Sequence, residues 1–595
     1  MSSDNQKVAV EVAIGALGKW KDTYKWVPVF GAITAIAMAF SVGANNLPAS
    51  FSTPVGSGTL TLLQGSIAAC LIYVPGAAFA SNSTVTALFS DFIKENQPNE
   101  GLLMWSMVVV VITATIWLVI ATCLELPVSS QQSIQGALLG TMLVTEGFSF
   151  IPLWNKNENH NFNGGGILWI FLEWTVAPLI ACLLAYCLFA ILKASMLRRE
   201  NARKRILIFL PIFYGITAGM LCFFVMYQVI PNFKNVYNWI TILAVAMATL
   251  IGALFSLVEV VPLVRRRLDT AETFKTTKKK GFSEASCIEC QDRTSNTEAD
   301  DNEKFEEALR DFMQRKVLDT VYEEDERSWA SAEPITEPEQ VQPVSQSTAG
   351  QATPLKQLLE STPNHLVQSR NFQKIKKKTT ENPSELIRDF TRSKIFPVIE
   401  YDRHTLIRHA LAEKFDDMED LFGFLQVLAS CMFALIQSAS EVAAVVSPFG
   451  AILDVFTHRA KYSGNAEDVG SLHVNWWFRA LGGLSASMGF FLCGWRLTQC
   501  LGGKLTYISN SRGMALQLSS VATMIMLTKL KLPVSSVHAF IGSSVGVGIA
   551  DDPRNVNWRY LVKILCGWVI TVLFCCSVSF AIYAFTIHSP AYIVP

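Results

Sequence analysis

The sequence predicts an all-α polytopic membrane protein built from two related sets of transmembrane helices. Three observations indicate this fold class. Hydrophobic residues make up 51% of the 595 residues and charged residues only 16%, with a mean hydropathy of +0.32. Uncharged segments such as 102–124 are long enough, at about 1.5 Å per residue, to cross a hydrocarbon core of roughly 30 Å. The pentapeptide Leu-Pro-Val-Ser-Ser occurs once in each half of the chain.

About twelve membrane segments are expected, seven before a charged insert and five after it. The short segments 133–152, 514–528 and 536–550 are expected to form re-entrant hairpins rather than full spans, which normally need ~20 residues. The other expected segments are 26–44, 59–80, 102–124, 167–193, 206–230, 239–264, 421–439, 476–499 and 560–587.

The charged residues are concentrated in one central insert. Residues 265–420 hold 25 Lys and Arg and 31 Asp and Glu, more than half of all charges in the chain. Stretches rich in Pro, Glu, Gln and Ser favour disorder over a packed domain, so this insert is expected to be a largely disordered loop. The chain is therefore divided into an N-terminal segment, a first transmembrane repeat, the loop, a second repeat and a C-terminal tail: 1–25, 26–264, 265–420, 421–587 and 588–595.

Basic residues predict the orientation of these segments. Residues 198–205 and the start of the loop at Arg265–Arg267 are separated by two spans, so they fall on one side of the membrane. Lys and Arg favour the cytoplasmic side. We therefore expect an integral, multi-pass protein with a cytoplasmic 265–420 loop, in the plasma membrane rather than an organelle. The net charge of zero gives no indication of a nucleic-acid partner.

The duplicated motif carries the main indication of function. Residues Leu126–Gly136 and Leu532–Gly542 share Leu-Pro-Val-Ser-Ser and a glycine at the same offset. Proline starts or breaks a helix, and serines behind it fall at a helix N-terminus, where free N–H groups and the helix dipole favour an anion. A single copy would favour serines that only cap a helix, but two matched copies favour an anion site. The candidate anion-binding residues are Ser129, Ser130, Gln131, Ser535, Ser536 and His538.

A second pair of motifs, Gly43–Ser50 and Ser438–Ala444, lies upstream of each serine pair. Together with Thr59–Gln64, Pro178 and Ser511–Gly513, these motifs resemble the inorganic phosphate transporter (PiT) family of sodium- or proton-coupled permeases. The resemblance covers 30–264 and 421–587 but not the insert. It implies that phosphate is the anion, and it places the coupling cation at Asn45, Asn46, Ser440, Glu441 and Gln517.

Several positions depart from the family pattern. Asn46 stands where the family has Asp, and Tyr73 and Gln517 stand where glutamates are expected, so Glu441 is the remaining acid of four. Because a sodium ion in a membrane prefers a carboxylate ligand, these losses put sodium coupling in doubt. Three outcomes stay open: transport with altered coupling, with a proton link through Glu441 or His538 as one form of it; transport of another oxyanion; and a degenerate member kept as a structural component of a membrane assembly.

The resemblance favours a secondary active transporter, a symporter of inorganic phosphate that works by alternating access with Na⁺ or H⁺ as coupling ion. The alternative is a non-transporting relative that serves as a structural subunit of a membrane complex. An enzyme is not expected, because the chain has no phosphate-cradling GxxxxGK[ST] loop, no HExxH and no nucleophile elbow with its partners. No cofactor beyond the coupling ion is expected. The expected partners are phosphate and the lipid bilayer, and a homo-oligomer or a membrane complex is left open.

Three further charged residues lie in or beside the predicted spans. Glu125 and Glu173 stand close to span ends and are expected near the membrane interface, while Arg496 is expected to extend its head group to the interface.

Overall fold

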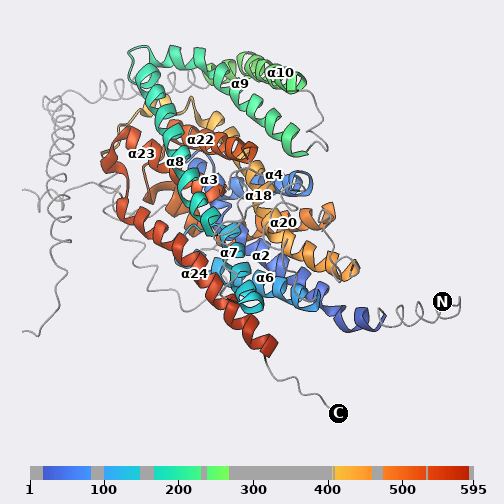
Figure 1. Cartoon of the computed structure of the whole chain (residues 1–595). Coiled ribbons are helices and arrows are strands. Elements are labelled where there is room, and N and C mark those ends of the chain that lie inside the picture. Colours follow the sequence, from blue (N-terminus) through green and yellow to red (C-terminus); the bar gives the residue numbers. More distant parts are fainter. Residues whose placement is uncertain are drawn as a thin grey trace, which may run out of the picture. The chain divides into compact units, whose positions relative to one another are not determined.

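The computed structural model describes residues 18–81, 100–147, 167–229, 238–266, 411–458, 474–530 and 534–588, together with Thr405 and His409 (Figure 1). Every regular element in these ranges is a helix, as the predicted fold class requires. Most of the predicted 265–420 loop, most of the N-terminal segment and the C-terminal tail lie outside the described residues, as do Leu532 and Pro533 of the second motif.

The first half of the described chain contains eight α-helices and two π-helical turns. They are α2 (Trp26–Asn45), α3 (Pro48–Gly56), α4 (Leu62–Ala80), α6 (Glu100–Cys123), α7 (Ser130–Glu146), α8 (Ile167–Leu192), η2 (Lys193–Leu197), α9 (Ala202–Val229), α10 (Asn238–Phe255) and η4 (Ser256–Val260).

The second half follows the same plan without counterparts of α9 and α10 among its described residues. It contains α17 (Asp416–Glu419), α18 (Gly423–Thr457), α20 (Trp476–Cys493), α21 (Trp495–Gln499), η5 (Cys500–Lys504), α22 (Asn510–Lys529), α23 (Ser536–Asp551), η6 (Pro553–Asn555) and α24 (Trp558–His588).

The helices match most predicted segments, with several corrections. Helix α3 was not expected, the segment at 476–499 is divided at Gly494, and the segment expected at 133–152 ends at Glu146. The segment expected at 421–439 ends too early, because α18 continues through Glu441 and Pro448 to Thr457. Apolar and small residues follow Glu441, so nothing in the local sequence ends the helix there. Eight helices in the described ranges are long and apolar enough to span a membrane, α2 and α3 being counted together. The expected count of twelve is therefore not confirmed. Helices α7 and α23, with 17 and 16 residues, are shorter than a full span.

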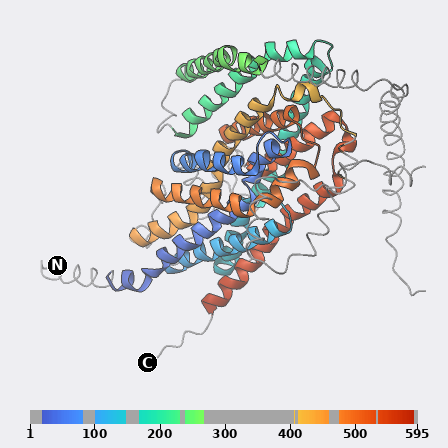
Figure 2. The ribbon, with the colours of Figure 1, turned by 180° about the vertical axis from the view of Figure 1, so that it is seen from behind.

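Equivalent helices of the two halves pack in equivalent pairs. Helix α7 packs against α24, and α23 packs against α8, so the helix after each serine pair is covered by an apolar helix of the other half. The pairs α2–α6 and α18–α22 correspond in the same way, as do α4–α18 and α20–α2. Helix α18 runs through the middle of the bundle in both ribbon views (Figures 1 and 2). Exchange of the two halves thus leaves the pairing pattern unchanged.

Glycines allow the two crossed helix pairs to touch backbone to backbone. A Cβ atom on Gly140 of α7 would lie 2.2 Å from the Cys576 carbonyl oxygen of α24. A Cβ atom on Gly546 of α23 would likewise lie 2.2 Å from the Cys182 carbonyl oxygen of α8. Small residues at four-residue spacing are typical of close helix packing in membranes. The close glycine contact is therefore repeated in both halves, as the serine pair is.

Alanine at Gly140 or Gly546 is expected to destabilise the protein by about 1–3 kcal/mol, because the opposing carbonyl belongs to backbone and cannot rotate away. Thermal unfolding in detergent measures the effect. The matched control is Gly65→Ala in α4, where the nearest atom would be an ordinary 3.7 Å away. Equal melting temperatures for Gly546→Ala and Gly65→Ala would contradict this view of the packing.

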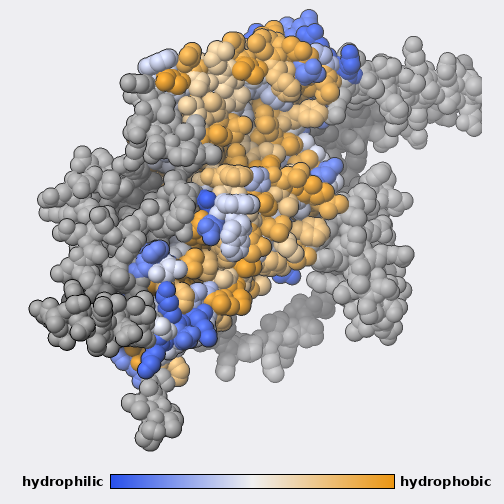
Figure 3. Space-filling view, turned by 90° about the vertical axis from the view of Figure 1, so that its right-hand side faces the viewer, coloured by the Kyte–Doolittle hydropathy of each residue, from blue (hydrophilic) through white to orange (hydrophobic). Residues whose placement is uncertain are grey.

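The outer surface of the described helices is strongly apolar. Large hydrophobic side chains such as Leu179 on α8, Ile208 on α9, Ile242 on α10 and Leu573 on α24 are more than 60% exposed. Figure 3 shows this hydrophobic surface over one face of the molecule. Helices α9 and α10 pack against one another, and only 6% of the apolar window of 239–266 is buried. Such a surface is suited to lipid, and with the candidate spans it identifies an integral, multi-pass membrane protein.

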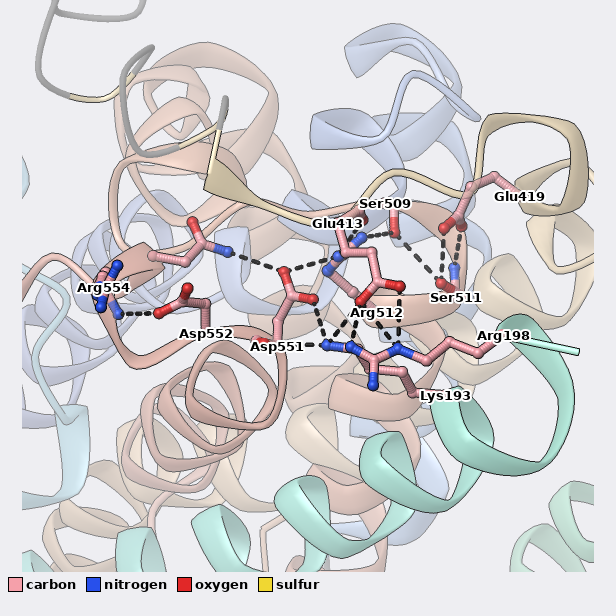
Figure 4. Close-up of polar contacts among 11 residues, drawn as sticks. Lys193, Arg198, Glu413, Glu419, Ser509, Ser511, Arg512, Asp551, Asp552 and Arg554 are labelled. Atoms are coloured by element: carbon pink, nitrogen blue, oxygen red, sulfur yellow. Dashed lines mark hydrogen bonds and ion pairs between the residues drawn. The ribbon is translucent and has the colours of Figure 1, made fainter. Parts of the chain in front are cut away.

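A cluster of charges, buried at Asp551, Arg512 and Lys193 and partly exposed at Glu413 and Arg198, connects both halves at one end of the bundle (Figure 4). The Asp551 carboxylate at the end of α23 accepts from Arg512 of α22 at 2.8 Å and from Lys193 of η2 at 3.1 Å. Glu413, which precedes α17, pairs with Lys193 at 3.1 Å and with Arg198 at 2.7 Å. The hydrogen bond from Arg198 holds the pKa of Glu413 below its ordinary value, against the opposing effect of partial burial. Through these ion pairs, Glu413 holds the segment before α17 against η2 of the first half, and Lys193 of η2 also pairs with Asp551 of the second half.

Candidate functional site

Both serine pairs lie at helix N-termini, as the duplicated motif predicts. Helix α7 begins at Ser130 with Ser129 as its N-cap, and α23 begins at Ser536 with Ser535 as its N-cap. The Ser129 hydroxyl accepts from the Gln132 N–H at 3.4 Å. The Ser535 hydroxyl is buried and has no hydrogen-bond partner among the described residues.

The two helix N-termini meet at one carboxylate, that of Glu441 on α18. Ser130 Oγ donates to Glu441 Oε2, and Ser536 Oγ donates to Glu441 Oε1 at 2.6 Å. Asn46 Nδ2 donates to Oε2 at 2.7 Å. Glu441 is only 1% exposed, and both serines are fully buried. The structure therefore brings four predicted site residues from both repeats together around a negative charge, which the positive ends of α7 and α23 favour.

Gln437 also belongs to this group, although it was not predicted from the sequence. Its Nε2 donates to the Asn46 carbonyl at 2.8 Å and to Ser536 Oγ at 3.2 Å. Its Oε1 accepts from Ser50 Oγ at 2.6 Å. Gln437 lies four residues before Glu441 and so shares its helix face, which was the signal available in the sequence.

Asn46 lies where the first repeat interrupts its helix. Helix α2 ends at Asn45 and α3 begins at Pro48, whereas α18 runs unbroken through the corresponding Glu441. The Asn46 Oδ1 atom is buried without a hydrogen-bond partner. Interrupted helices of this kind are typical of ion and substrate sites in secondary transporters.

Asn45 does not face Glu441. Its Oδ1 accepts from the Val128 N–H at 3.0 Å, and its Nδ2 donates to the Leu126 carbonyl at 3.0 Å and to Thr122 at 3.1 Å. From α24, the Trp568 indole donates to the Pro127 carbonyl at 3.2 Å. Asn45 thus holds the turn that presents Ser129 and Ser130, which differs from the coupling role expected from the resemblance.

Glu125, in that same turn, is half-buried rather than solvated. Its φ of +60° is unusual for a residue with a side chain, and Lys504 pairs with its carboxylate at 2.7 Å. The Tyr560 hydroxyl donates to its carbonyl at 2.9 Å. Interactions from η5 and α24 thus stabilise a strained turn directly before the first serine pair.

The other predicted coupling residues bond mainly to backbone, and Gln517 also donates to the Thr53 hydroxyl at 3.0 Å. Gln517 Nε2 donates to the Ala49 and Ser50 carbonyls at 3.1 and 3.0 Å, while its Oε1 has no partner among the described residues. Ser440 Oγ donates to the Gln437 carbonyl of its own helix at 3.1 Å. Gln131 is buried in the first turn of α7. Of the predicted coupling set, the structure places Asn46 and Glu441 together and separates the others from them.

His538 points to a different neighbour from the one expected. Its Nδ1 lies 3.9 Å from Oε1 of Glu173 on α8, and the Trp568 ring lies against it edge to face at 4.0 Å. Glu173 is 1% exposed. The expectation that Glu173 faces the membrane interface is therefore wrong, because α23 covers the face of α8 on which it lies.

The chain matches the model of the phosphate transporter family over residues 42–579. It is 25% identical to the phosphate-repressible phosphate permease of Neurospora crassa, over 95% of this chain and 98% of that protein. It is 24% identical to human sodium-dependent phosphate transporter 2, over 93% of this chain and 96% of that protein. Among solved structures, a sodium-dependent phosphate transporter has a similar fold, with a TM-score of 0.60, 19% identity and coverage of 95% of this chain and all of that chain.

Proposed function

Because the chain belongs to the phosphate transporter family, we propose that it is a symporter that carries inorganic phosphate across a membrane. Relatives that match it almost from end to end are named as phosphate permeases or sodium-dependent phosphate transporters. The observation that supports this function best is the convergence of Ser130 and Ser536 on opposite oxygens of Glu441. Nothing in the comparisons favours the alternative of a non-transporting structural subunit.

The phosphate site lies at the N-termini of α7 and α23. The Glu441 carboxylate accepts the same serine hydrogens that an oxyanion needs, so phosphate binds by replacing it at Ser130 and Ser536. Phosphate and an ionised Glu441 repel one another strongly in a site of low dielectric constant. A proton or a cation must therefore neutralise part of the charge when phosphate enters, and this requirement couples the two fluxes.

Alternating access follows from the position of Glu441. It lies on α18, the central helix, while its hydrogen-bond donors come from α7 and α23 of opposite repeats. Each of these two helices is paired with a helix of the other half, α24 or α8. Motion of these crossed pairs against α18 opens the serine site to either side of the membrane.

The plasma membrane is the proposed location, with the 265–420 loop on the cytoplasmic side. The proposed side of the loop is supported by the clustering of Arg and Lys at 198–205 and at Arg265–Arg267, at ends of spans separated by α9 and α10. Phosphate and lipid are the proposed partners.

Ser130→Ala and Ser536→Ala are each expected to raise the KM for phosphate by about 10- to 100-fold. A hydrogen bond with a charged partner contributes roughly 1.5–3 kcal/mol, and phosphate loses one such bond in either variant. Uptake of radiolabelled phosphate into proteoliposomes, with sodium and pH gradients imposed separately, measures the effect.

The matched control is Ser520→Ala, because the Ser520 hydroxyl is buried but bonds only to the Leu516 carbonyl of its own helix at 2.9 Å. An unchanged KM for phosphate in both serine variants would refute the proposed phosphate site. Folded wild-type protein without uptake above empty vesicles would favour the structural-subunit alternative.

A further inference from the structure

We propose that Glu173 and His538 form the binding site for a coupling proton. This inference rests on the proposed function and names the ion that accompanies phosphate. The two side chains come from α8 and α23, which belong to opposite repeats and pack tightly through Gly546. Their atoms Oε1 and Nδ1 lie 3.9 Å apart, and the residues are 1% and 0% exposed.

Little surrounds the two side chains that could hold a charge, the amide of Gln132 beside Glu173 being the neighbouring polar group. Both carboxylate oxygens of Glu173 and both ring nitrogens of His538 are buried without a hydrogen bond among the described residues. An ionised carboxylate alone in such a place is very costly, and so is an isolated imidazolium. The pair is neutral overall when it holds one proton, either as Glu173–COOH with neutral His538 or as an ion pair. One proton is therefore the favoured occupancy.

The groups around the pair favour a proton over a metal cation. Helix α7 presents the neutral amide of Gln132, and α24 presents the indole of Trp568. Sodium needs several oxygen ligands, whereas the oxygens beside the pair are those of Glu173 and Gln132. The imidazole nitrogens and the Trp568 ring, whose centroid lies 4.0 Å from that of His538, supply no oxygen. An imidazole next to a carboxyl is instead suited to accept and release a proton.

Other charges near the pair connect it to the phosphate site. From α18, the carboxyl of Glu441 interacts electrostatically with Glu173. The charged residues of α22 lie at its ends, Arg512 paired with Asp551 and Lys529 over the ring of Phe223. Negative charge gained near Glu441 therefore strengthens proton binding at the pair.

The residues of the proton site are also close to the serines along the chain. His538 is two residues after Ser536, and Gln132 is two residues after Ser130. Ser536 and His538 are thus separated by less than one helical turn along α23, and Ser130 and Gln132 by less than one turn along α7. The proton and the phosphate bind cooperatively and cross together.

The test uses the full-length protein in proteoliposomes with an internal pH-sensitive dye. Phosphate accumulation driven by an alkaline interior is compared with phosphate–phosphate exchange at equal pH, and sodium-driven accumulation is measured in parallel. In wild type, a pH gradient is expected to drive accumulation, and proton entry to accompany phosphate. In Glu173→Gln, the ratio of pH-driven accumulation to exchange is expected to fall at least tenfold, and Glu173→Asp is expected to restore part of it.

The matched control is Glu259→Gln, since Glu259 lies in η4 on an exposed face of a predicted span. Wild-type exchange with accumulation that follows only the sodium gradient would overturn the proton site but leave the proposed function intact. An unchanged ratio of pH-driven accumulation to exchange in Glu173→Gln would likewise overturn the proton site and leave the proposed function intact. Absence of exchange in folded wild-type protein would instead refute the proposed function, and the proton site with it.

Discussion

Glu441→Gln is expected to lower phosphate uptake about 100-fold, the largest effect of any single change in the site. The carboxylate accepts hydrogen bonds from Ser130, Ser536 and Asn46, which come from both repeats. Gln has the same shape but carries no charge, and its NH₂ group cannot accept a hydrogen bond. Without the charge, entry of phosphate no longer requires the proton or cation whose gradient drives uptake, and an about 100-fold loss of rate corresponds to roughly 3 kcal/mol.

Radiolabelled uptake in proteoliposomes measures this effect, and thermal unfolding in detergent shows whether the variant is folded. Glu441→Asp keeps the charge on a shorter side chain and is expected to recover part of the uptake. Glu259→Gln, on an exposed face of η4, is expected to behave like wild type. Wild-type uptake by a folded Glu441→Gln protein would show that the convergence of the serines on this carboxylate has no part in transport.

Asp551→Ala is expected to destabilise the protein by about 3–5 kcal/mol, the largest effect on folding of any single change described. The Asp551 side chain is fully buried and pairs with Arg512, 1% exposed, and Lys193, 7% exposed. Removing one member of a buried ion pair leaves its partner as an uncompensated charge in a medium of low dielectric constant. The melting temperature of the purified protein in detergent measures the loss.

A double-mutant cycle separates the ion pair from the fold around it. Arg512→Met together with Asp551→Ala is expected to lose less stability than the sum of the two single variants, because no unpaired guanidinium remains. Asp552→Asn is the neighbouring control: Asp552 caps η6 through a bond from the Arg554 N–H, and Asn caps equally well. Additive losses in the cycle would argue against a strong buried pair.

Much of the fold could be predicted because hydrophobic length and repeated motifs are local properties of the sequence. The spans, the short helices α7 and α23 and the serines at their N-termini all follow from segments of fewer than 30 residues. The early end predicted for α18 shows the limit of this approach. A polar run at Ser438–Glu441 looks like the end of a span, yet the helix continues. The two serines bond to carbonyls of α18 itself, and Glu441 is buried and bonded by Ser130, Ser536 and Asn46.

The partners of individual site residues could not be predicted, because they depend on contacts between distant parts of the chain. Asn45 and Asn46 are adjacent in the sequence, but one bonds to the turn before α7 and the other to Glu441. His538 was grouped with the anion site by its distance from Ser536 along the chain. Only the packing of α23 on α8 brings it to Glu173, more than 350 residues away in the sequence.

The crossed pairing of the two halves also bears on how the protein is made. Helices α7 and α8 emerge from the ribosome roughly 400 residues before α24 and α23, the helices that cover them. Until synthesis is nearly complete, the glycine face of α7 and the buried carboxyl group of Glu173 on α8 must be accommodated by lipid or by the insertion machinery. The contacts of α7 with α24 and of α8 with α23 can therefore form only late in synthesis.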